Sequence, residues 1–131
     1  MPAGNLLQEH LHWLDLAQQE LEFARISPGA GGVLLENLCD HAHQAAVNAL
    51  RAVLAHYHIS FSGDEDLSQL LRRVPDHAAA ADALGHVTAL ERIGAAEPYQ
   101  REVPVTEPQY HEALTIARRV VDWAQTLIEA S

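Results

Sequence analysis

The stretch that decides the fold is residues 34–70, which read LLENLCDHAHQAAVNALRAVLAHYHISFSGDEDLSQL. Alanine and leucine recur there at spacings of three and four, which predicts one amphipathic helix from about Val33 to Tyr57. Because small side chains let two helix backbones come close, we expect this helix to be central. Its inward face is expected to carry Leu35, Leu38, Ala42, Ala45, Ala46, Ala49, Val53 and Leu54.

The segments on both sides of this helix predict further helices. A Ser-Gly-Asp break at 62–64 precedes a short helix over 66–74, for which Asp64 is the expected N-cap. Apolar spacing predicts helices over 6–25, with Leu11 facing inward, and over 77–95. Thr106-Glu107-Pro108-Gln109 has the pattern of a capping box and predicts the start of a last helix. No segment alternates with period two, so we expect a single all-α domain over residues 1–131, an up-and-down bundle of four to five helices.

Composition narrows the classes of function. The formal net charge is −10, and all eight basic residues are arginine. An acidic surface repels phosphate backbones, which argues against broad nucleic-acid binding. No apolar run reaches membrane-spanning length and no secretory signal opens the chain, so we expect a cytoplasmic protein without membrane contact. The single cysteine, Cys39, is expected to be a buried structural thiol.

Several short segments, taken in order, resemble HEPN domains of prokaryotes, which are small bundles of four or five helices. The resemblance rests on His12–Ala17, on Cys39–Arg51 with its Gln-Ala-Ala run, on Asp64–Leu67, on Glu97–Gln100 and on Glu112–Trp123. It covers nearly the whole chain. It implies a homodimer and, for the branch that pairs with a minimal nucleotidyltransferase, a protein partner of that kind.

Three polar positions of the family pattern are missing. Val47 stands where the family often has Glu, Glu65 where it has His, and Pro98 where it has Arg. Arg51 keeps the basic position and Tyr99 the aromatic one. The losses imply a site with degenerate polar motifs, which favours a non-catalytic role.

The best candidate binding group is Arg51, Tyr99 and Arg101. The two loop residues could fold over the central helix, and a guanidinium with an aromatic face suits the phosphate or base of a nucleotide. The alternative is that both arginines pair with acidic neighbours.

A ribonuclease is the alternative enzymatic interpretation. Ribonuclease members of the family use an Arg-x(4–6)-His pair, in which His moves a proton and Arg holds the phosphate. Arg51 and His56 have this spacing, as do Arg51 with His58 and Arg72 with His77, although such spacings also arise by chance. No histidine follows Arg118 or Arg119.

Metal binding is not expected. The pairs His10/His12, His41/His43 and His56/His58 are two residues apart, and such neighbours diverge on a helix by about 200°. These histidines are expected to face solvent, and no cofactor is implied. Trp13 and Trp123 are expected to be core or interface anchors.

The sequence therefore predicts a HEPN-like module that is non-catalytic or binds nucleotide weakly. It would work with a minimal nucleotidyltransferase in a toxin–antitoxin-like or regulatory pair. The alternatives are a metal-independent ribonuclease toxin that uses Arg51 and His56, and a ligand-free dimerisation or interaction domain.

Overall fold

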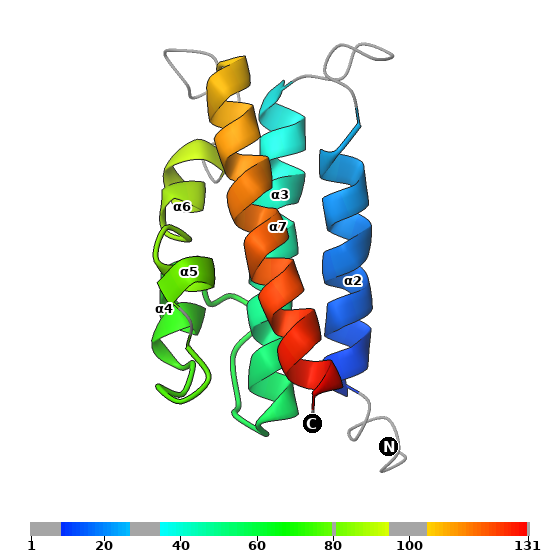
Figure 1. The fold of residues 1–131 in the computed structure, drawn as a ribbon, viewed down its shortest axis with the longest axis vertical. Coiled ribbons are helices and arrows are strands. Elements are labelled where there is room, and N and C mark those ends of the chain that lie inside the picture. Colours follow the sequence, from blue (N-terminus) through cyan, green and yellow to red (C-terminus); the bar gives the residue numbers. More distant parts are fainter. Residues whose placement is uncertain (1–8, 27–34, 80, 95–104, 131) are drawn as a thin grey trace.

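The computed structural model describes residues 9–26, 35–79, 81–94 and 105–130, and within them the only regular elements are helices. Three long helices, α2 (Glu9–Ala24), α3 (Leu35–His56) and α7 (Glu107–Glu129), lie side by side. Three short ones, α4 (Leu67–Arg72), α5 (Ala81–Leu84) and α6 (Ala89–Gly94), form a column along one side of them (Figure 1). The predicted all-α bundle is confirmed.

Figure 1 also shows the direction of the chain. Helices α2 and α3 are antiparallel, the column of short helices runs back, and α7 follows the same direction as α3. Helix α3 packs against α2, α7, α6 and α4, and is therefore the central helix that the alanine pattern predicted. No described helix is both long and apolar enough to cross a bilayer.

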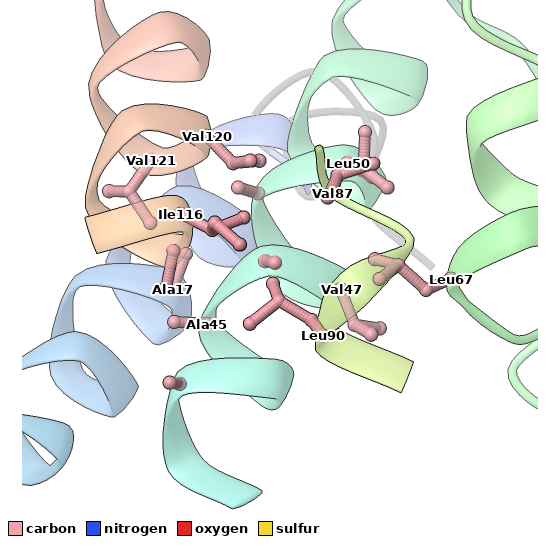
Figure 2. Packing of buried hydrophobic residues seen from close by; sticks show 14 of the residues in the cluster. Ala17, Ala45, Val47, Leu50, Leu67, Val87, Leu90, Ile116, Val120 and Val121 are labelled. Atoms are coloured by element: carbon pink, nitrogen blue, oxygen red, sulfur yellow. The ribbon is translucent and has the colours of Figure 1, made fainter. Parts of the chain in front are cut away.

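The core is built around small residues of α3. Ala42, Ala45, Ala46 and Ala49 are fully buried, and so is Ala17 of the neighbouring α2. Figure 2 shows larger side chains from the other helices, and from the turn between α5 and α6, closing around this face. They include Leu67, Val87, Leu90, Ile116, Val120 and Val121.

Polar contacts fix the helix ends. Thr106 caps α7 as predicted, and Gln109 completes the capping box. The Tyr110 hydroxyl donates to the Ala24 carbonyl at 2.6 Å, which satisfies one of the last carbonyls of α2. Glu91 of α6 accepts hydrogen bonds from the backbone N–H (2.9 Å) and hydroxyl (3.1 Å) of Ser68, so α6 holds the first turn of α4.

Some expectations were wrong in detail. The N-cap of α4 is Asp66 and not Asp64, because Asp66 is in extended conformation and its carboxylate receives the Gln69 amide. The helix predicted over 77–95 is divided into α5 and α6 by a turn that begins at Gly85, a residue with low helix propensity. Leu11 is 49% exposed, on the outer side of α2. Among the paired histidines, His43 is buried and not solvent-facing.

Candidate functional site

Arg51 lies where α2, α3 and the segment after α3 meet. Its guanidinium carbon is 5.0 Å from the centre of the Trp13 ring of α2. One terminal nitrogen donates to the Asn48 side-chain oxygen at 3.2 Å, and the other donates to the Gly63 carbonyl at 2.9 Å. The predicted binding arginine thus joins two helices to a loop.

The nearest aromatic side chains extend this group. Trp13 meets Phe61 edge to face, with ring centres 5.9 Å apart, and its indole N–H donates to Glu9 at 3.3 Å. Beside it lies a cleft of about 330 Å³ lined by Glu9, Ala55, His58, Ile59, Ser60 and Phe61. The cleft is bounded by the first turn of α2 and by the segment that follows α3.

Burial shifts the pKa values of two side chains in this region. It lowers the pKa of the Arg51 guanidinium, and the Nε atom of that side chain is buried without a hydrogen-bond partner in the described part of the chain. Burial, with the nearby His10 and His58, also lowers the pKa of His56. His56 is therefore neutral at pH 7, while Arg51 stays charged.

The structure places Arg51 and His56 on the same helix but in different surroundings. Five residues apart on α3, their side chains diverge by about 140°. Arg51 rests on Trp13, whereas the His56 ring lies 5.5 Å from that of His10. His58 is in the left-handed backbone region, with φ of 59°, and lines the cleft.

The other sequence candidates fall into two groups. Tyr99, Arg101 and Pro98 lie outside the described residues. Val47 is buried in the core, and Glu65 forms an ion pair with Arg73 at 2.7 Å, which lowers the pKa of the Glu65 carboxyl.

Sequence reasoning missed the partners of Arg51. Trp13 was expected to be a core or interface anchor, and its separation of 38 positions from Arg51 gives no periodic signal. Asn48 is three residues before Arg51 and therefore on the same helical face, a spacing that could have indicated the contact. The bond to the Gly63 carbonyl depends on the path of the loop, which side-chain types do not encode.

No group of three or more His, Cys, Asp or Glu side chains in the described part of the chain could hold a metal ion. Cys39 is fully buried, as expected of a structural thiol. Trp123 donates to the Ala78 carbonyl at 2.9 Å and so anchors the short helices to α7.

Comparison with known proteins agrees with this architecture. No curated protein matches the chain significantly. The crystal structure of ST0689, an archaeal HEPN homologue, superimposes with a TM-score of 0.70 and 26% sequence identity, and the match covers 91% of this chain and 97% of that one. The family model described as the HEPN domain matches residues 10–127. The chain therefore belongs to the HEPN domain family.

Proposed function

We propose that this chain is a non-catalytic HEPN module that acts through a protein partner, a minimal nucleotidyltransferase, in a toxin–antitoxin-like or regulatory pair. The observation that carries the proposal is the set of contacts made by the Arg51 side chain. Its guanidinium is held by Trp13, Asn48 and the Gly63 carbonyl. An arginine that stabilises a developing phosphate charge must present its N–H groups to substrate. Here it positions a loop.

The partner part of the proposal is supported by membership of the HEPN family. Affinity purification of the tagged full chain from its host, followed by mass spectrometry, tests it. We expect a minimal nucleotidyltransferase in stoichiometric amount. Recovery of the chain with no such protein would refute the pairing.

Weak nucleotide binding is assigned to Arg51 together with Tyr99 and Arg101. Arg51 is only half-buried, and two of its terminal N–H groups are outside the hydrogen bonds described above. Calorimetric titration with ATP and GTP should give heat in the wild type and none in Arg101→Ala. Equal heat from the wild type and from Arg101→Ala would place the ligand elsewhere, and no heat from the wild type would remove nucleotide binding.

The proposal includes a homodimer. Phe23 and Ile26, three positions apart, are 52% and 40% exposed at the end of α2 and just after it, which is apolar surface suited to a protein contact. Light scattering should give twice the 14.4 kDa chain mass. Phe23→Ser should shift the protein toward the monomer, whereas Glu22→Ser, a neighbouring exposed position, should not. A monomeric wild type would contradict this part.

A further inference from the structure

A second cleft, of about 410 Å³, lies on the side of α7 near the turn between α5 and α6. It is lined by His86, His111, Glu112, Thr115, Ile116 and Arg119. The Arg51 group is formed instead by α2, α3 and the segment after α3, and it shares none of these residues. The second cleft is therefore not part of the site described above.

The cleft gathers hydrogen-bond donors on one helical face. His111, Thr115 and Arg119 follow one another at intervals of four on α7, which aligns them along the helix. His86 reaches the same cleft from the turn before α6, and the buried Ile116 gives it an apolar floor. A guanidinium, a hydroxyl and two imidazole rings therefore line one hollow.

Arg119 forms no ion pair with any residue that the structure describes. The ion pairs within the described residues join Arg25 to Glu22, His41 to Glu20 and Arg73 to Glu65. Arg119 makes none of them, although acidic residues outnumber basic ones in this chain by 18 to 8. An exposed guanidinium without a carboxylate partner is suited to an anion from solution, and its fork matches the oxygens of a phosphate group.

Glu112 decides what else the ligand carries. Its carboxylate lines the same cleft and would repel a bare anion. It can accept a hydrogen bond from a hydroxyl group a few ångströms away from the phosphate. A hollow of this volume is within the range that holds a small organic molecule.

From these observations we infer that the α7 cleft binds a small phosphomonoester that carries a hydroxyl group. Arg119, His111 and His86 hold the phosphate, Thr115 adds a hydroxyl donor, and Glu112 accepts from the ligand hydroxyl. The sequence pattern missed this site because it sought a histidine after each arginine. His111 instead precedes Arg119 by two turns, and His86 comes from another part of the chain.

Calorimetric titration of the full chain with glycerol 3-phosphate and with inorganic phosphate tests the inference. We expect glycerol 3-phosphate to bind more tightly than phosphate, and Arg119→Ala to weaken both by about tenfold or more, as is usual for a charged hydrogen bond. Arg118→Ala is the matched control, since Arg118 directly precedes Arg119 on the helix, carries the same charge and does not line the cleft. It should leave both affinities unchanged.

A second variant tests recognition of the ligand hydroxyl separately from recognition of the phosphate. Glu112→Gln should tighten binding of inorganic phosphate and reduce the preference for glycerol 3-phosphate. All positions changed are exposed, so thermal melting should match the wild type. Absence of binding by the wild type at about 10 mM ligand, a concentration near the weakest useful affinity, would overturn the inference. Equal losses of affinity in Arg118→Ala and Arg119→Ala would also overturn it.

Discussion

At the scale of single residues, Arg51 is the side chain on which the functional argument depends. In an exposed position an arginine costs little to replace, but this one makes two hydrogen bonds and covers an indole face. Its charge is partly removed from water, and this burial lowers the pKa of the guanidinium. These contacts make Arg51 a structural anchor for the segment after α3.

Arg51→Ala should therefore destabilise the fold. We expect the free energy of unfolding to fall by about 2 kcal/mol, because hydrogen bonds from a charged group and a cation–π contact are lost together. Urea denaturation followed by circular dichroism measures the change. Arg118→Ala, at an exposed position of α7, should change it by less than about 0.5 kcal/mol. Equal stability of Arg51→Ala and the wild type would show that Arg51 is free to do other work.

Replacement of His43 should have the opposite effect on stability from replacement of Arg51. His43 is 9% exposed, and neither ring nitrogen has a hydrogen-bond partner among the described residues. An unsatisfied buried polar group costs about 1–3 kcal/mol, so His43→Leu, which keeps a similar volume, should stabilise the protein by about 1 kcal/mol. His41→Leu is the control, because His41 contacts Glu20 at 2.6 Å and should lose stability. A destabilised His43→Leu would indicate a polar partner for this ring.

The same residue links stability to pH. Burial lowers the pKa of His43 below its ordinary value, although Asp40, Glu91 and Asp66 oppose the shift. The unfolded chain therefore takes up this proton more readily than the folded one, and stability is lost as the pH falls through about 6.5. His56 adds to the loss in the same direction. Urea midpoints at pH 7.5 and 5.5 should differ less in His43→Leu than in the wild type, and an unchanged difference would contradict this assignment.

At the scale of elements, the long helices and the short α4 were predictable, whereas the division into α5 and α6 was not. Strong apolar periodicity and the capping box at Thr106 located α3 and α7 within a few residues of their ends. The apolar pattern over 77–95 did not reveal the division into α5 and α6, which begins at Gly85, a residue with low helix propensity. Likewise, Asp64 and Asp66 are equally good caps by type, and only backbone geometry distinguishes them.

The Thr106 cap provides a test at this scale. Its side chain accepts the Gln109 amide at 3.3 Å in the first turn of α7. Thr106→Ala should lower the free energy of unfolding by about 1 kcal/mol. Thr126→Ala makes the same chemical change inside the helix at an exposed position and should be neutral or slightly stabilising. Equal effects of the two variants would show that the cap contributes nothing.

At the scale of the whole molecule, the helical bundle carries the cleft beside the Arg51 group and the α7 cleft on different elements, and the two clefts share no lining residue. The fold could be derived from periodicity, whereas the environment of Arg51 could not. Trp13, Asn48 and Gly63 meet that side chain only after α2, α3 and the following segment have packed together. The sequence therefore indicated Arg51 as a candidate functional residue. It did not show whether the side chain anchors a loop or binds a phosphate.

The most direct test of the central claim is RNA cleavage by the purified full chain. Structured RNA and transfer RNA should remain intact after incubation with the wild type, because the Arg51 and His56 side chains diverge on α3 and lie in different surroundings. His56→Ala, run in parallel, should behave in the same way. Cleavage by the wild type that disappears in His56→Ala would contradict the account and make the Arg51–His56 pair a ribonuclease centre.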